Sequence, residues 1–217
     1  MLRCDLIMSR RALVTEVAGF TGAYSTNELL REGWSVAGLM RHTNERNRVS
    51  MPNSVVTYVA DLNDTHAINQ AFQAVRPNAV IHLAAVSHVC HDGINRLYAT
   101  NVIGSSTLLR VLAREQPDVE AVLQASSAYI HGNVTQSVST EDGAAHPSND
   151  YGASKLSMKL MALTWMQTLP ITLVQPLNYF GVGQSKSFVI PKIVQHFWEI
   201  ATTLELGNLE LVVLVAE

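Results

Sequence analysis

Short apolar runs alternate with helix-like segments along this chain of 217 residues, and this alternation constrains the fold more than any other feature. The runs that we expect to form strands are 12–15, 35–40, 55–60, 79–83, 121–125 and 171–174. Helical patterns fall at 22–33, 65–75, 95–114, 151–168 and 188–200. Strands that are apolar throughout are buried on both faces, as in a parallel sheet covered by helices. The sequence therefore predicts an α/β Rossmann fold with a doubly wound parallel sheet over residues 10–200.

A glycine-containing turn joins the first expected strand to the first helix. Gly19 and Gly22 stand three residues apart there, with Phe20 and Thr21 between them. Backbone N–H groups at such a turn can bind the pyrophosphate of a dinucleotide, so these four residues are predicted to bind the cofactor. A tight turn without a ligand is the alternative. Glu16 occupies the position of the first glycine of such loops, and its carboxylate predicts weakened cofactor affinity.

Arg41 follows the second expected strand, where the adenosine ribose binds in dinucleotide folds. An acidic residue at this point would bind the 2′-hydroxyl of NAD, and the segment Leu39 to His42 contains none. An arginine can instead face a 2′-phosphate, so the sequence favours NADP, with NAD possible. An exposed loop arginine without a ligand is the alternative.

Tyr151 and Lys155 stand four residues apart at the start of an expected helix, and they share one helix face. A nearby ammonium lowers the pKa of a phenol, which can then exchange a proton with a substrate while hydride moves to or from a nicotinamide. Ser127 follows the fifth expected strand, at the edge where ligands bind. The three residues are the candidate catalytic group, and a surface Tyr/Lys pair is the alternative.

The chain resembles the extended short-chain dehydrogenase/reductase family of nucleotide-sugar epimerases and dehydratases, from about Arg10 to Val194. The resemblance rests on 14–22, 61–62, 82–85, 101, 126–127, 151–155 and 176–178. It implies that Asp61 and Leu62 flank the adenine. It also implies that Ala84 and Ala85 line the cofactor, and that Asn101 supports the lysine through a water.

Within that family, residues 175–184 and 187–192 resemble the branch of GDP-mannose 4,6-dehydratase and GDP-6-deoxy-4-keto-mannose reductase. The resemblance implies a GDP-sugar substrate near Asn178, and we also place Ser87 and His88 at the substrate. Dehydratases of this kind carry a glutamate two places after the catalytic serine, and this chain has Tyr129 there.

A phenol of ordinary pKa is a poor substitute for a carboxylate in acid/base chemistry, so we also place Tyr129 in the substrate site but favour the reductase. The expected reaction is reduction of a GDP-4-keto-6-deoxy-mannose-type sugar. A GDP-mannose dehydratase or a sugar epimerase is the alternative.

Other features depart from the family. Gln175 stands where relatives usually have arginine, and the chain ends at Glu217, where they continue into a substrate-binding lobe. We therefore expect a truncated lobe with 201–217 as its remnant, and a leader at 1–9. A non-catalytic remnant that binds a dinucleotide is the second hypothesis.

Composition restricts the partners. The net charge of −3 gives no basic surface for nucleic acid, and no apolar run is as long as a membrane span. Cys4 and Cys90 lie in no motif, which favours the cytoplasm. His88 and His91 lack cysteine or acidic partners at matching spacing, so we expect no metal site. The resemblance also implies a homodimer formed through the helices 95–114 and 151–168.

Overall fold

The computed structural model describes residues 10–42, 51–87, 93–133, 140 and 143–200. The expected leader 1–9 and the expected lobe remnant 201–217 lie outside the described residues.

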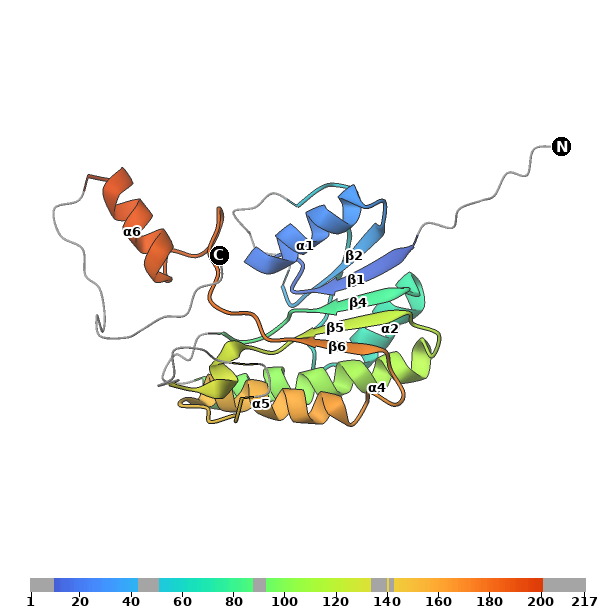
Figure 1. Ribbon diagram of the computed structural model, residues 1–217. Coiled ribbons are helices and arrows are strands. Elements are labelled where there is room, and N and C mark those ends of the chain that lie inside the picture. Colours follow the sequence, from blue (N-terminus) through green and yellow to red (C-terminus); the bar gives the residue numbers. More distant parts are fainter. Residues whose placement is uncertain (1–9, 43–50, 88–92, 134–139, 141–142, 201–217) are drawn as a thin grey trace.

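Six parallel strands form one sheet in the order β3-β2-β1-β4-β5-β6 (Figure 1). The strands are β1 (Arg11–Thr15), β2 (Ser35–Met40), β3 (Val56–Val59), β4 (Ala79–His82), β5 (Ala121–Ala125) and β6 (Ile171–Val174). The predicted doubly wound parallel sheet is thus confirmed. Because the strand order reverses between β1 and β4, a crevice is expected beyond the carboxyl ends of these two strands.

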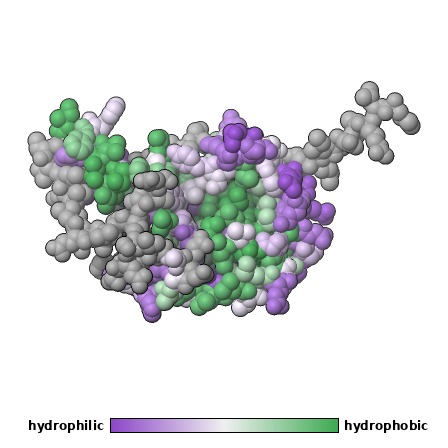
Figure 2. Space-filling view, viewed as in Figure 1, coloured by the Kyte–Doolittle hydropathy of each residue, from purple (hydrophilic) through white to green (hydrophobic). Residues whose placement is uncertain are grey.

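Helices cover both faces of the sheet (Figure 1). They are α1 (Phe20–Arg31), α2 (Thr65–Val75), α3 (Ile94–Tyr98), the π-helix η1 (Ala99–Gly104), α4 (Ser105–Glu115), the 3₁₀-helix η2 (Ala128–His131), α5 (Asp150–Leu163) and α6 (Val189–Trp198). Figure 1 shows α2, α4 and α5 on one face and α1 on the other, while α6 projects from the body. No residue within α6 is buried, and Figure 2 shows its apolar side chains at the surface.

Polar side chains determine where two of these helices begin. Asp64 accepts a hydrogen bond from the amide of Ala67 at 3.0 Å and caps α2. Asn149 accepts one from the amide of Gly152 at 2.8 Å and caps α5. These side chains satisfy amides that have no partner within the first helical turn.

Two predicted helices differ from the observed ones. The run predicted at 95–114 contains the six-residue π-helix η1, whose wider turn is common at functional sites. The helix predicted to reach residue 168 ends at Leu163, and the next residue, Thr164, donates its hydroxyl proton to the carbonyl of Met161 at 2.7 Å. Such a local side-chain bond competes with helix continuation.

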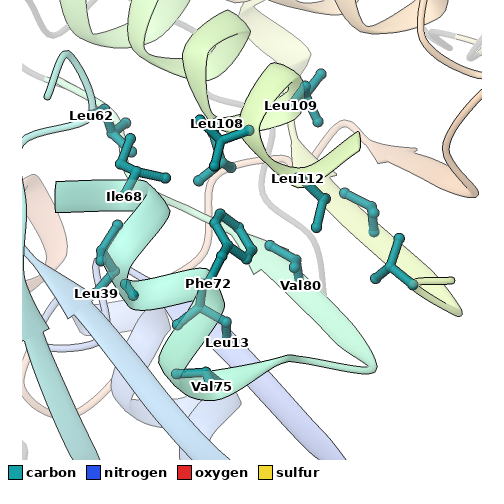
Figure 3. Packing of buried hydrophobic residues seen from close by; sticks show 14 of the residues in the cluster. Leu13, Leu39, Leu62, Ile68, Phe72, Val75, Val80, Leu108, Leu109 and Leu112 are labelled. Atoms are coloured by element: carbon teal, nitrogen blue, oxygen red, sulfur yellow. The ribbon is translucent and has the colours of Figure 1, made fainter. Parts of the chain in front are cut away.

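The main hydrophobic cluster fills the space between the sheet and the helices α2 and α4 (Figure 3). Phe72 and Leu112 lie there without any exposure, together with Leu13 and Val80 from the sheet. Burial of one such side chain stabilises the fold by about 1.5–3 kcal/mol. A smaller cluster lies on the α1 face around Val14, so both faces hold the carboxyl ends of β1 and β4 firmly in place.

Candidate functional site

The turn between β1 and α1 brings the backbone close to itself at two glycines. The amide of Gly19 donates to the carbonyl of Glu16 at 2.8 Å, and a Cβ on Gly22 would overlap that same carbonyl oxygen. Gly19 precedes the helix and has no side chain to cap it. An uncapped helix start with close backbone packing fits the pyrophosphate of a dinucleotide, as the sequence predicts.

Glu16 adopts a conformation that suits glycine. Its φ angle is 57°, in the left-handed region, where a side chain costs about 1 kcal/mol or more. A Cβ on Gly19 would lie 2.6 Å from Cγ and 3.3 Å from Oε1 of Glu16. The carboxylate therefore lies beside the N-terminus of α1, in the region where a bound pyrophosphate would carry its charge.

The predicted adenosine end of the site lies after β2 and β3. Arg41 follows β2, and no described residue accepts a hydrogen bond from its buried Nε. Asp61 follows β3, and its Oδ1 accepts hydrogen bonds from the amide and the Nδ2 of Asn63, at 2.8 and 2.9 Å. Leu62 is buried and packs so closely on Gly104 that a Cβ there would lie 2.6 Å from the Cβ of Leu62.

Ser127, Tyr151 and Lys155 lie together where β5 ends and α5 begins. The phenol of Tyr151 is hydrogen-bonded to the hydroxyl of Ser127. Nζ of Lys155 donates to the carbonyl of Ala125 at 2.9 Å, and this lysine is 3% exposed. The structure thus brings the three predicted residues to one point, from two elements that the sheet and the α5 cap hold in place.

The pKa values in this cluster follow from burial. Burial lowers the pKa of Lys155 to about 8. Burial also raises the pKa of Tyr151, the hydrogen bond from Ser127 lowers it, and the neighbouring phenols of Tyr179 and Tyr129 raise it further. The sequence predicted a lowered tyrosine pKa, and this prediction is wrong because removal of the phenol from water outweighs the hydrogen bond that lowers its pKa. Tyr151 therefore holds its proton at neutral pH.

Two more tyrosines border Tyr151. The ring of Tyr129, predicted to contact substrate, meets the ring of Tyr151 edge-on, with centroids 5.8 Å apart. Tyr179 shares a hydrogen bond of 2.6 Å with the hydroxyl of Thr21 and stacks on Phe20 at 6.1 Å. Sequence reasoning missed Tyr179, although it directly follows Asn178 in a stretch that the analysis had singled out.

Asn101 lies fully buried in the π-helix η1. Its Oδ1 accepts from the amide of Val86 at 2.8 Å, and its Nδ2 donates to the carbonyl of Val86 at 3.1 Å and to Oγ of Ser154 at 3.0 Å. Asn101 therefore joins the segment after β4 to α5. Ala84 and Ala85, in that same segment, are half-buried.

The remaining predicted residues spread along the same edge. Ser87 is exposed at the end of the segment after β4, and His88 lies outside the described residues. Asn178 is half-buried after β6. Oε1 of Gln175 accepts a hydrogen bond from Nε2 of His131 at 2.9 Å, a contact that the sequence did not indicate.

The described residues contain neither a metal-binding cluster nor a helix that could span a membrane. No set of three histidine, cysteine or acidic side chains in the described part of the chain is arranged to hold a metal ion. No helix within the described ranges has the length and apolarity needed to cross a membrane.

The chain is similar to proteins that act on nucleotide sugars. GDP-6-deoxy-D-talose 4-dehydrogenase of Aggregatibacter actinomycetemcomitans is 30% identical over 166 residues, which is 76% of this chain and 56% of that protein. A candidate epimerase of Burkholderia cenocepacia has a crystal structure with a TM-score of 0.84 and 39% identity, covering 93% of this chain and 65% of that one. The chain thus spans less than two thirds of the length of these relatives.

A solved structure with cofactor bound has the same fold. The dTDP-glucose 4,6-dehydratase DesIV of Streptomyces venezuelae, with NAD and TYD bound, matches with a TM-score of 0.78 and 27% identity. That match covers 88% of this chain and 63% of DesIV. The family model described as GDP-mannose 4,6 dehydratase matches residues 13–212. The chain therefore belongs to the GDP-mannose 4,6-dehydratase family, within the extended short-chain dehydrogenases/reductases.

Proposed function

We propose that this protein is an NADP-dependent reductase of a GDP-4-keto-6-deoxy sugar. The observation that carries the proposal is the hydrogen bond between Ser127 and Tyr151, with Lys155 one turn further along α5 and Tyr129 in the place of a dehydratase glutamate. The similarity to a GDP-6-deoxy-D-talose 4-dehydrogenase supports a sugar C4 carbonyl as the reacting group. NADPH would supply the hydride and leave as NADP.

The protein's own groups would handle the proton. Tyr151 is protonated at neutral pH, and we infer that its phenol donates this proton to the carbonyl oxygen as hydride reaches the carbon. The Ser127 hydroxyl would bind the same oxygen, which polarises the C=O bond. The ammonium of Lys155 would stabilise the phenolate that remains until solvent reprotonates it.

The preference for NADP rests on Arg41. Its buried Nε lacks an acceptor among the described residues, at the strand end where an adenosine 2′-phosphate would lie. A phosphate could supply that acceptor, and a 2′-hydroxyl would supply less charge. NADPH is therefore expected to bind about tenfold more tightly than NADH, and Arg41→Gln should remove the difference.

A second candidate, the dehydratase, is favoured by the description of the matching family model. The two functions differ in their net reaction. A reductase consumes NADPH, whereas a dehydratase transfers the hydride from the sugar to the cofactor and back to the sugar. The test incubates the protein with NADPH and GDP-4-keto-6-deoxy-mannose, and separately with NADP and GDP-mannose. Tyr151→Phe is the control.

Oxidation of NADPH that depends on the keto sugar, and that Tyr151→Phe abolishes, is the expected result. Formation of a 4-keto sugar from GDP-mannose without net NADPH use would overturn the reductase in favour of the dehydratase. Thermal stabilisation by NADPH with turnover in neither reaction would contradict both and leave a dinucleotide-binding module.

A further inference from the structure

A row of buried polar side chains runs from β1 through β4 to the start of α4. Thr15 on β1 pairs in register with His82 on β4, and both are buried, with 0% and 2% exposure. Ser105, at the start of α4, is also fully buried. Burial of polar groups costs free energy unless each group has a hydrogen-bond partner, so the contacts of this row define what it can do.

The hydrogen bonds of the row determine which atom donates and which atom accepts at each contact. Oγ1 of Thr15 accepts from the amides of Leu83 and Ala84, both at 3.0 Å, which occupies its two lone pairs. Its own proton must therefore go to Nδ1 of His82, 2.8 Å away. Nε2 of His82 then carries the ring proton and donates it to Oγ of Ser105, also at 2.8 Å.

The same sequence of donors and acceptors continues into the π-helix η1. The hydroxyl of Ser105 donates to the backbone carbonyl of Asn101 at 2.8 Å. Burial, followed by the charge of Lys155, lowers the pKa of His82 to about 3. A neutral ring with one donor and one acceptor is the form that the two flanking hydroxyls require. His82 thus keeps a single tautomer across the working pH range.

Asn101 links these hydrogen bonds to α5. Its Nδ2 donates to Oγ of Ser154 at 3.0 Å, and Ser154 donates its own proton to the carbonyl of Tyr151 at 2.8 Å. The chain of hydrogen bonds therefore begins at the end of β1 and ends at the backbone of Tyr151. It links five elements, β1, β4, α4, η1 and α5, of which only η1 and α4 are adjacent in the sequence.

We propose that His82 is a positioning residue that fixes Tyr151 relative to the ends of β1 and β4, through Ser105, Asn101 and Ser154. Because β1 and β4 border the crevice, their ends would locate the cofactor, and Tyr151 must stand at a fixed distance from it. The role of Tyr151 rests on the proposed function. The geometry of the hydrogen bonds does not depend on that function.

The sharpest test removes one link of the chain at Ser105. Ser105→Ala deletes the hydroxyl that joins His82 to Asn101 and leaves every residue of the crevice in place. Ser157→Ala is the matched control, because Ser157 makes the same kind of bond to a carbonyl four residues earlier, Ala153, at 2.9 Å, but on the exposed surface of α5. His82→Gln is a second variant, since its amide can reach one of the two hydroxyl partners but not both.

Two readouts separate positioning from a merely structural role. The first is the phenol titration of Tyr151 in ligand-free protein, taken as the absorbance difference from the same variant carrying Tyr151→Phe. Ser105→Ala should raise the Tyr151 pKa, because the hydrogen bond from Ser127 that lowers this pKa weakens when the helix shifts. The second is kinetics, where kcat should fall about tenfold or more while KM and NADPH affinity stay within about twofold.

Each outcome decides the proposal. Ser157→Ala should match the parent protein in both readouts, and His82→Gln should follow Ser105→Ala. Loss of melting temperature in Ser105→Ala with unchanged titration and kcat would overturn the proposal, as would equal behaviour of Ser105→Ala and Ser157→Ala. If the parent reduces no keto sugar, the proposed function fails while the titration still decides the role of His82.

Discussion

The turn between β1 and α1, here called the phosphate turn, and the row of Thr15, His82 and Ser105 both lie at the carboxyl ends of β1 and β4, yet they differ in internal consistency. In the row, the side chains of Thr15, His82 and Ser105 have hydrogen-bond partners in an order that leaves no conflict. In the turn, Glu16 holds a left-handed conformation and places a carboxylate beside a helix start suited to anions. The two regions share β1, because Thr15 of the row directly precedes Glu16 of the turn, whereas Tyr151 itself lies on α5.

The largest expected effect would test whether the proton chemistry is intact. Tyr151→Phe removes the phenol proton that we propose is donated to the substrate carbonyl, and kcat should fall about 10²- to 10⁴-fold. NADPH affinity, measured by fluorescence titration, should stay the same, because the phosphate turn is untouched. A Tyr151→Phe variant that keeps its activity would contradict the role of Tyr151 as the proton donor.

The buried lysine predicts a dependence of stability on pH. Folding lowers the pKa of Lys155 from 10.5 to about 8, so between these values the unfolded chain binds more protons than the native one. Native stability should therefore rise with pH through that window, by at most about 3 kcal/mol, at about 1.4 kcal/mol per pKa unit. Urea unfolding of the parent protein and Lys155→Met across this range is the measurement. The difference between the two chains should change in that direction, and a flat difference would contradict the shift.

We expect Glu16 to weaken cofactor affinity in two ways, through its charge and through its left-handed conformation. Glu16→Gln removes the charge and keeps the side chain, while Glu16→Gly also relieves the left-handed strain. We expect NADPH affinity to rise several-fold for the first and about tenfold for the second, since 1.4 kcal/mol corresponds to a factor of ten. Calorimetric titration of both variants gives the division. If neither binds NADPH more tightly, the turn is not the weak region.

Local patterns predicted much of the fold. The six strands were identifiable because parallel strands buried on both faces are apolar along their length, as Val80 and Leu13 illustrate. The phosphate turn was identifiable from Gly19 and Gly22, which permit close backbone approach.

Other features depend on tertiary contacts that a local pattern does not contain. The π-helix escaped detection because one extra residue in a turn hardly disturbs apolar spacing near Asn101. The upward shift of the Tyr151 pKa arises from burial, which the spacing to Lys155 does not reveal. The partner of Thr21, Tyr179, lies 158 residues away in the sequence.

That separation has a consequence for how the protein is made. Tyr24 also bonds the carbonyl of Val182, 158 residues further along, and Gly181 packs on Phe20. Ribosomes add about 5–20 residues per second, so α1 is synthesised roughly ten to thirty seconds before the segment that covers its first turn. During that interval the nascent chain lacks the residues that cover the first turn of α1 in the finished fold, so these contacts can form only late in synthesis.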